Sequence, residues 1–487
     1  MRYQFPLVIV PSDDRNKQLA FPNRTKCSQQ PKQHSKRVLR HIALAFAMLM
    51  PNLVLARQPG RNVGTDTPPG APHTTASPLL FGMQMNGGTI SQQPWPQANF
   101  AAIRLWDSAT HWRDINTADG VYDWSNLDKW LQRAQAGNVE VLYTFGEVPS
   151  WASSDPGDYT CAGGPGACDP PDDLNADGTG SNQHWKNFVA TIVSHNQRSQ
   201  TGHIHAWEMW NEAFGNPHRW KGTQAQLLRM AQDASTLIKA ADNSAVVLTP
   251  TFAPLLNPSR LQLASYLAAG GGQFADAIAL HGYVMTRTGD RPEDLVTFMK
   301  LSDPILAKYG QSNKPLWDTE ASWGNIENTH FTDPDLQAAF VARSYLLHWS
   351  LGISRYYWYE WNNSLVGQLW IPDPHDADGP GKLLKPGISY VQLYNWIVGA
   401  TLDSGCTQDG TVWSCAFWRH GGYEAEAIWD TGESCDHGTC GSVRYRVDRK
   451  YRQYRTVYGE TFPIRRSTVE IGAKPILLEN RTSRGSQ

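Results

Sequence analysis

The sequence predicts an eight-stranded (β/α)8 barrel followed by a small β-sandwich. The prediction rests on short apolar runs that alternate with amphipathic helical stretches over about 320 residues, the arithmetic of a (β/α)8 barrel. It also rests on the segment after Gly399, where short alternating runs replace the helical periods, as in a sandwich. A doubly wound sheet is the alternative, but no Gly-x-Gly-x-x-Gly follows the first expected strand.

Eight strands and seven helices account for the barrel, which we expect to span residues 79–399. The expected strands are 80–85, 102–106, 140–145, 206–210, 246–250, 277–281, 315–319 and 355–359. The expected helices are 127–136, 185–194, 224–241, 261–268, 294–308, 336–351 and 388–396. Residues 86–100, between the first two strands, read as a loop. The sandwich should span 400–480, with strands at 412–418, 425–429, 443–447, 454–457 and 469–471.

The amino terminus has the parts of a secretory signal. Residues 1–56 hold nine Lys and Arg against two acids, and an apolar run at 42–50 precedes the small residue Ala56. That run is short for a membrane span, which needs about 20 apolar residues. We therefore expect an exported protein, secreted or periplasmic, with no stable membrane span after processing. An N-terminal membrane anchor is the alternative. Residues 57–78, rich in Pro, Gly and Thr, should form a flexible linker.

Composition excludes several classes of protein. The chain has 487 residues, of which 18% are charged and 20 are Trp. This aromatic content with few charges argues against disorder and against a coiled coil. The formal net charge is −2, and the Lys and Arg residues after residue 57 are scattered along the sequence. We therefore expect no nucleic-acid partner.

Six cysteines follow the leader, which itself contains Cys27. They form three sequence-local pairs, which suits three short-loop disulfides in an oxidising compartment. Six cysteines allow 15 connectivities, so local pairing is one possibility among several. A zinc site is the other reading, although the spacings are not those of a finger or ribbon. The residues are Cys161, Cys168, Cys406, Cys415, Cys435 and Cys440.

Two glutamates stand at the ends of expected strands. Asn211 and Glu212 follow the fourth strand, and Glu320 follows the seventh. In a (β/α)8 barrel the chemistry lies at the carboxyl ends of the strands. Two carboxylates on that face can cleave a glycosidic bond, one as a protonated acid and the other as an ionised nucleophile. Read singly, each would be an ordinary surface or salt-bridged acid; their joint placement favours the catalytic interpretation.

These residues carry a resemblance to a known family. The Trp-Asn-Glu at 210–212 and the Glu at 320 resemble the catalytic signatures of the large clan of retaining (β/α)8 glycoside hydrolases. Within it, the segments 103–107, 122–124 and 149–151 resemble glycoside hydrolase family 39, and most closely its bacterial members that act on exopolysaccharide. Ala213 is a departure, because many relatives have Pro there.

The resemblance implies a role for each matching residue. Glu212 would be the acid/base, Glu320 the nucleophile, and Asn211 the partner of the sugar 2-hydroxyl. Arg104 would support the nucleophile, and polar side chains on the sixth strand would hold the site. Trp358 or Trp361 would be the platform under the sugar. The sixth-strand residues are His281 and Tyr283.

Aromatic residues at strand ends offer faces on which sugar rings can stack. Trp151, Trp323 and Trp358 are the expected platforms, and packing in the barrel core is the alternative for each. We further expect Arg104 to keep Glu320 ionised, and apolar neighbours such as Trp210 to raise the pKa of Glu212. The loop 173–178 resembles the opening of a calcium loop, but His184 stands where the bidentate Glu is required.

The sequence therefore predicts a retaining glycoside hydrolase that works by double displacement. We expect endo action on an extracellular polysaccharide, with an oligo- or polysaccharide as partner and with no metal or cofactor. The alternatives are an exo-acting, β-xylosidase-like glycosidase and a non-catalytic carbohydrate-binding barrel. A transglycosylase would use the same residues and would differ only in the acceptor.

Overall fold

The computed structural model describes residues 74–87, 95–285, 291–329, 331–376 and 379–481. The predicted leader, with its apolar run and Cys27, and most of the predicted linker lie outside the described residues. The described residues belong to one compact unit. None of the helices in this part of the chain is long and apolar enough to cross a membrane.

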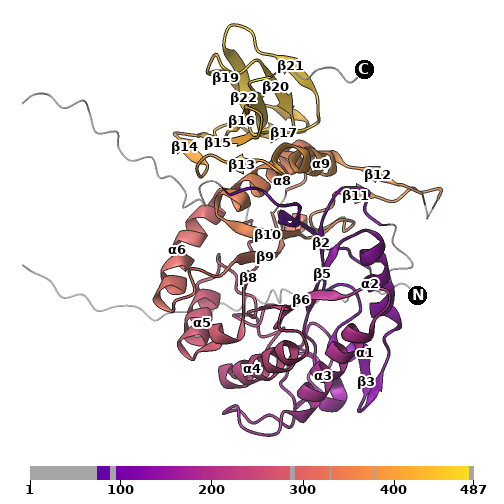
Figure 1. Cartoon of the computed structure of the whole chain (residues 1–487). Coiled ribbons are helices and arrows are strands. Elements are labelled where there is room, and N and C mark those ends of the chain that lie inside the picture. Colours follow the sequence, from indigo (N-terminus) through magenta and orange to yellow (C-terminus); the bar gives the residue numbers. More distant parts are fainter. Residues whose placement is uncertain (1–73, 88–94, 286–290, 330, 377–378, 482–487) are drawn as a thin grey trace, which may run out of the picture. The chain divides into compact units, whose positions relative to one another are not determined.

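Eight parallel strands form one sheet, which confirms the predicted fold class (Figure 1). Their order is β7-β6-β5-β2-β1-β10-β9-β8. Two parallel bridges, Leu248 to Ala277 and Phe252 to Leu280, join the end of β7 to β8 and close the sheet into a barrel. The strands are β1 (Phe81–Met83), β2 (Ala102–Leu105), β5 (Glu140–Thr144), β6 (Ile204–Glu208), β7 (Val246–Leu248), β8 (Ile278–Leu280), β9 (Leu316–Ala321) and β10 (Ile353–Trp358).

Helices follow the strands and cover the outside of the barrel (Figure 1). In α2 the buried residues Leu127, Trp130, Leu131 and Ala134 recur three or four positions apart, so one stripe faces the sheet. The long helices are α2 (Ser125–Ala136), α3 (Gln183–Arg198), α4 (Gln224–Ala241), α5 (Asn257–Ala268), α6 (Asp294–Lys308), α8 (Pro334–Ser350) and α9 (Lys385–Ile397). Two single-turn helices, α1 (Trp112–Ile115) and α7 (Ile326–Thr329), lie in loops.

Most of the tryptophans fill the core of the molecule. Trp185 illustrates the packing, since its ring centroid lies 5.2 Å from that of Trp112 and 5.0 Å from that of Phe145. Composition alone did not tell whether the Trp rings pack in the core or bind a ligand. Their burial shows that the rings named below pack in the core. The fully buried ones are Trp112, Trp130, Trp185, Trp207, Trp210, Trp323, Trp349, Trp358, Trp361, Trp396 and Trp429.

The C-terminal region forms two antiparallel sheets that face each other across a small apolar core, as the predicted β-sandwich requires. A seven-stranded sheet has the order β13-β15-β16-β23-β20-β21, with β14 beside β15, and β19 pairs with β22. Ile428, Ile471 and Leu478 lie in the core between the sheets. The strands are β13 (Thr401–Leu402), β14 (Thr407–Asp409), β15 (Val412–Arg419), β16 (Tyr423–Asp430), β19 (Ser442–Arg446), β20 (Gln453–Thr456), β21 (Thr461–Pro463), β22 (Thr468–Gly472) and β23 (Ile476–Glu479).

All three predicted local disulfides form. Cys161 pairs with Cys168 in the loop after β5, and Cys406 pairs with Cys415 on β15. Cys435 pairs with Cys440 across the short hairpin β17 (Cys435–Asp436) and β18 (Thr439–Cys440). The zinc reading of these six cysteines is excluded, because each of them is in a disulfide and none retains a thiol to ligate a metal.

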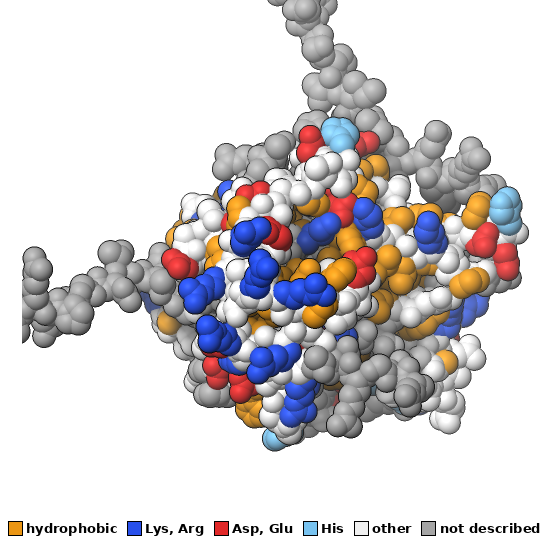
Figure 2. Space-filling model, turned by 90° about the horizontal axis from the view of Figure 1, so that it is seen from above, with side chains coloured by type: hydrophobic (Ala, Val, Ile, Leu, Met, Phe, Trp, Pro, Cys, Tyr) orange, Lys and Arg blue, Asp and Glu red, His pale blue; other side chains and the backbone are white. Residues whose placement is uncertain are grey.

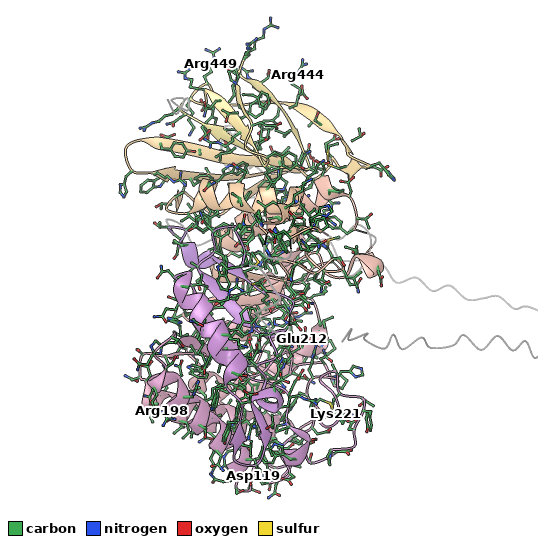
Figure 3. All side chains as sticks on the ribbon, turned by 90° about the vertical axis from the view of Figure 1, so that its right-hand side faces the viewer. Asp119, Arg198, Glu212, Lys221, Arg444 and Arg449 are labelled. Atoms are coloured by element: carbon green, nitrogen blue, oxygen red, sulfur yellow. A yellow bond between two sulfur atoms is a disulfide. The ribbon has the colours of Figure 1, made fainter. Side chains whose placement is uncertain are left out.

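Positive charge gathers on the C-terminal sheets. Figure 2 shows Lys and Arg side chains concentrated on the face that these sheets turn to solvent. Figure 3 places two of them, Arg444 and Arg449, at the end of the molecule remote from Arg198 and Asp119 of the barrel. The expectation that the basic residues after residue 57 are scattered is therefore corrected, because eight of them fall within residues 442–466.

Candidate active site

The two predicted catalytic glutamates meet at the carboxyl end of the barrel. Glu320 is the second-last residue of β9, and Glu212 lies four residues after the end of β6. Glu212 adopts a φ of 47°, a left-handed conformation that non-glycine residues rarely take. Its backbone N–H donates to Oγ1 of Thr251 at 2.7 Å, which holds this conformation in place. Strained backbone of this kind is concentrated at functional sites.

The two carboxylates are close and reachable from solvent. One carboxylate oxygen of Glu212, one of Glu320 and a ring nitrogen of His281 all lie within 4.8 Å of one another. The side chain of Glu212 is 32% exposed and that of Glu320 is 11% exposed. Both carboxylates can therefore reach the same bond of a bound ligand.

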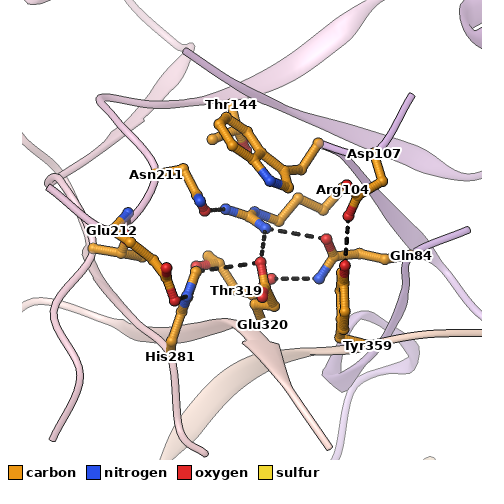
Figure 4. A network of polar contacts seen from close by, with 12 residues as sticks. Gln84, Arg104, Asp107, Thr144, Asn211, Glu212, His281, Thr319, Glu320 and Tyr359 are labelled. Carbon is orange, nitrogen blue, oxygen red and sulfur yellow. Dashed lines mark hydrogen bonds and ion pairs between the residues drawn. The ribbon is translucent and has the colours of Figure 1, made fainter. Parts of the chain in front are cut away.

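A fully buried arginine, Arg104, contacts several polar side chains at this end of the barrel (Figure 4). Nη1 of Arg104 donates to Oε2 of Glu320 at 2.8 Å, and Nη2 donates to Oδ1 of Asn211 at 2.6 Å. Nε donates to Oε2 of Glu208 at 2.8 Å. Burial lowers the pKa of Arg104, but Glu208 and Glu320 outweigh it and raise the pKa above its usual value. The arginine is therefore permanently charged beside Glu320.

Asn211 is oriented by its arginine partner. Arginine has donors only, so the amide oxygen of Asn211 must face Arg104, and the amide nitrogen remains as a donor. Asn211 itself is 2% exposed. The arrangement fixes one donor at the site, which is what hydrogen bonding to a sugar hydroxyl requires.

Polar groups from the loop after β8 surround Glu320. The hydroxyl of Tyr283 donates to Oε1 of Glu320 at 3.1 Å, and Nε2 of His281 lies 3.8 Å from Oε2. Burial raises the pKa of the Glu320 carboxyl, while the charges of His281 and Arg104 oppose the rise. The net direction is upward, so Arg104 limits the pKa of Glu320 without bringing it below the usual value.

The expected raised pKa of Glu212 is wrong. Burial raises this pKa, but the hydrogen bond and charge of His281, the charge of Arg219 and the amide of Asn216 outweigh it and hold the pKa at about 2. Nδ1 of His281 lies 3.1 Å from Oε1, and Nδ2 of Asn216 donates to Oε2 at 2.9 Å. Trp210, the expected apolar neighbour, packs against Trp220 instead.

A buried aspartate links the strands that carry the site, and sequence reasoning missed it. Oδ1 of Asp318 accepts the backbone N–H of Gly282 at 3.0 Å and that of Glu320 at 3.3 Å. Its Oδ2 lies 2.7 Å from Nε2 of His348. Asp318 therefore fixes the backbone between His281 and Tyr283 relative to the backbone of Glu320.

Gln84 and Tyr359 also lie at the site, and the sequence did not predict either of them as a site residue. Oε1 of Gln84 accepts from Nη1 of Arg104 at 3.0 Å, and its Nε2 donates to the carbonyl of Thr319 at 3.0 Å. The hydroxyl of Tyr359 donates to Oδ2 of Asp107 at 2.8 Å (Figure 4).

The three predicted tryptophan platforms do not join these residues. Trp358 is 0% exposed, donates from Nε1 to the carbonyl of Gly367 and packs against Trp323, which is 1% exposed. A fully buried ring offers no free face to a sugar, so the expectation for these two is corrected. Trp151 is half-buried; its Nε1 donates to the carbonyl of Asn116, and its ring meets His184 edge-on.

Metal-ligating side chains cluster at three places in the described part of the chain. The first is Glu212, His281 and Glu320; the second contains the disulfide-bonded Cys161 and Cys168. The third is Asp172, Asp173 and His184, in the loop that resembles a calcium site. There, Oδ2 of Asp173 accepts the Ser181 hydroxyl and the backbone N–H of His184 at the start of α3. Asp173 therefore caps the N-terminal end of α3.

Comparison with known proteins shows similarity in structure. No family model matches the sequence, and no curated protein matches it. A family 39 enzyme from Xanthomonas axonopodis pv. citri has 15% identity and a TM-score of 0.57, covering 84% of this chain and 95% of that one. A monomeric β-xylosidase from Caulobacter crescentus CB15 has 15% identity and a TM-score of 0.56, covering 84% and 97%.

A member of a second family has the same arrangement. A family 30 endoxylanase from Clostridium papyrosolvens C71 has 13% identity and a TM-score of 0.53, covering 85% of this chain and 99% of that one. The barrel and the C-terminal sheets together therefore match these solved structures over nearly their full length. The chain has the fold of glycoside hydrolases of families 39 and 30, the first of which the sequence resemblance had named.

Proposed function

We propose that the protein is a retaining glycoside hydrolase in which Glu212 is the acid/base and Glu320 the nucleophile. The observation that carries the proposal is the approach of their carboxylate oxygens to within 4.8 Å. Retaining enzymes hold the two carboxyl groups about 5–5.5 Å apart, whereas inverting enzymes leave about 6.5–9.5 Å for a water molecule. The similarity of the fold to solved glycosidases supports the same conclusion.

The first half of the reaction forms a glycosyl-enzyme. Glu320 attacks the anomeric carbon, and Glu212 gives a proton to the departing glycosidic oxygen. Arg104 and Tyr283 hold the attacking carboxylate through Oε2 and Oε1. Asn211, whose amide oxygen accepts from Arg104, would bind the 2-hydroxyl of the sugar through its amide nitrogen.

The proton that Glu212 must deliver is held on His281 in the ligand-free protein. The pKa of Glu212 is low, and the pKa of His281 is raised because Glu320 and Glu212 outweigh the effect of burial. Transfer from Nδ1 of His281 to Oε1 of Glu212, 3.1 Å away, supplies the acid without changing the charge of the site. When the glycosyl-enzyme forms, Glu212 is ionised again and activates water for the second step.

The substrate we propose is a β-linked extracellular polysaccharide, attacked within the chain. Solved structures of similar fold include an endoxylanase and a xyloglucanase with xyloglucan, which supports a polymer substrate. The long loop after β5, closed by Cys161 and Cys168, supplies a wall for an extended ligand. Three disulfides support an exported protein.

Substitution of the nucleophile tests this function. Glu320→Gln should lower kcat on aryl β-glycosides and on polysaccharide by at least about 10³-fold while leaving oligosaccharide binding intact. A non-catalytic carbohydrate-binding barrel would instead show no turnover in the native chain, and the native chain and Glu320→Gln would bind oligosaccharide equally. Release of monosaccharide alone from polymer would contradict endo action. Products longer than the substrate, formed with an added acceptor, would identify a transglycosylase.

A further inference from the structure

The C-terminal sheets contain a segment with an unusual charge. Residues 442–466 hold eight Lys and Arg and two acids, Asp448 and Glu460. The remainder of residues 57–487 holds 26 basic and 41 acidic residues. A segment this basic within an otherwise acidic protein produces a local positive field.

Strand pairing brings these basic residues onto one surface. The N–H of Val447 donates to the carbonyl of Ser467 at 3.1 Å, and that of Ile464 donates to the carbonyl of Arg452 at 2.9 Å. The turn at 465–468 therefore lies between Arg452 and the end of β19. A second turn, at 448–451, connects the same two points. The exposed arginines of these turns and of β19 form what we call the basic face: Arg444, Arg446, Arg449, Arg452, Arg465 and Arg466.

The charge of the basic face is not neutralised from within. Arg444 lies 3.4 Å from Glu470, and both side chains are exposed. The other five arginines have no ion pair with any acid among the described residues. By contrast, the neighbouring Lys450 pairs with Glu424 and Arg455 pairs with Glu479. Unpaired arginines on one surface repel one another, which costs stability. The same charges add to a positive field, which attracts an external anion to this face.

The chemistry of the face selects the class of ligand. Apart from Lys450, which Glu424 neutralises, its cations are arginines, whose planar guanidinium groups bind carboxylates with two parallel hydrogen bonds. Phe462 lies on β21, three residues before Arg465 in the chain; it is 42% exposed, and its ring stacks on Tyr454 at 5.3 Å. An exposed aromatic ring in the strand that leads into carboxylate-binding arginines suits a sugar that has both an apolar C–H face and an acidic group.

We propose that the basic face binds an anionic polysaccharide through the carboxylates of its uronic acid units. This proposal rests on the proposed function and deepens it, because it identifies the polysaccharide that the barrel cleaves as an acidic one. Figure 3 shows Arg444 and Arg449 away from Glu212, so the face holds the polymer at a place separate from the site of cleavage. A second contact of this kind raises the effective concentration of substrate at the barrel.

Nucleic acid is the competing polyanion, since phosphates also attract arginine. The polysaccharide is favoured because the face belongs to the same compact unit as the barrel with its paired carboxylates. Most motifs that read duplex DNA insert a helix into the major groove. The described residues of the basic face lie in strands and turns and include no helix.

Binding to defined polymers tests the proposal. Affinity electrophoresis and titration calorimetry would compare polygalacturonate, neutral dextran and duplex DNA with the full chain at several salt concentrations. We expect salt-sensitive binding to polygalacturonate and none to dextran. The triple variant Arg446→Gln/Arg465→Gln/Arg466→Gln should weaken polygalacturonate binding at least tenfold. It should also reduce the slope of log affinity against log salt by up to about one for each arginine removed.

A matched triple variant controls for net charge. Lys129→Gln/Arg198→Gln/Lys300→Gln removes three exposed cations from the barrel helices and should bind polygalacturonate like the native protein. Equal loss in both triples, or no loss in the first, would overturn the proposal. So would DNA binding as tight as polygalacturonate binding at the same salt. Hydrolysis of a small aryl glycoside is measured in parallel: if it is absent while polygalacturonate binds, the proposed function fails and the basic face stands.

Discussion

Nδ1 of His281 lies 3.1 Å from Oε1 of Glu212, and this contact sets the protonation of the proposed acid/base. Together with the charge of Arg219 and the hydrogen bond from Asn216, it holds the pKa of Glu212 at about 2 against the opposing effect of burial. The same ring reaches toward Glu320 through Nε2 at 3.8 Å. One histidine therefore stands between the two carboxylates, and both their charges depend on it.

Replacement of this histidine should change stability in a defined pH window. The folded pKa of Glu212 is lowered from 4.5 and that of His281 is raised from 6.5, so their ion pair stabilises fully between about pH 4.5 and 6.5. The stabilisation is lost as the pH falls from 4.5 toward 2, and as it rises through the folded pKa of His281. The difference in unfolding free energy between the native chain and His281→Asn should therefore peak in this window. Urea denaturation at several pH values measures it; a difference that does not vary with pH would refute the ion pair.

Loss of Arg104 should damage both stability and catalysis. Arg104→Met would leave Glu208 buried without its cation, at a cost of about 3–5 kcal/mol, and would release Glu320 and Asn211. Denaturant unfolding and kcat/KM on an aryl glycoside measure the two effects. Arg355→Met is the matched control, because Arg355 also forms a partly buried pair, with Glu140 at the opposite end of the strands. That variant should lose stability with kcat/KM nearly unchanged; an equal loss of kcat/KM would mean that Arg104 acts only through the fold.

A methyl group at Gly282 should disturb the site through Asp318. A Cβ at this position would lie 2.0 Å from Oδ2 of Asp318, the carboxylate that holds the backbone of Glu320. Gly282→Ala should destabilise the protein by about 1–3 kcal/mol and lower kcat more than it raises KM. Gly157→Ala, where no atom lies nearer than 3.6 Å, should change stability by less than about 0.5 kcal/mol. A fully active Gly282→Ala would show that Asp318 does not position Glu320.

The barrel could be predicted from the sequence because its strands are buried on both sides. Such strands appear as apolar runs, and each of the eight runs overlaps an observed strand. The catalytic pair could be found for the same reason, since Glu212 and Glu320 stand where two such runs end. The local disulfides followed from cysteine spacing. The strands β13, β14, β21 and β23 of the C-terminal sheet were missed; each is only two to four residues long and carries little pattern.

The direction of individual side chains was beyond the sequence. Residues 356–359 read Tyr-Tyr-Trp-Tyr, and neighbours in a strand point to opposite faces. With four aromatic residues in a row, nothing in the pattern tells which ring faces the site. Trp358 turned out to be buried, and Tyr359 contacts Asp107. The pKa of Glu212 was mispredicted for a related reason: its decisive neighbour is 69 residues away in the chain.

The central claim is that Glu212 and Glu320 cleave a glycosidic bond with retention of configuration. Proton NMR during hydrolysis of an aryl β-glycoside or a β-linked oligosaccharide reports the anomer of the sugar that appears first, before mutarotation. The account predicts that the β-anomer appears first and that its formation is lost in Glu320→Gln. First appearance of the α-anomer, or an undiminished rate in Glu320→Gln, would contradict it.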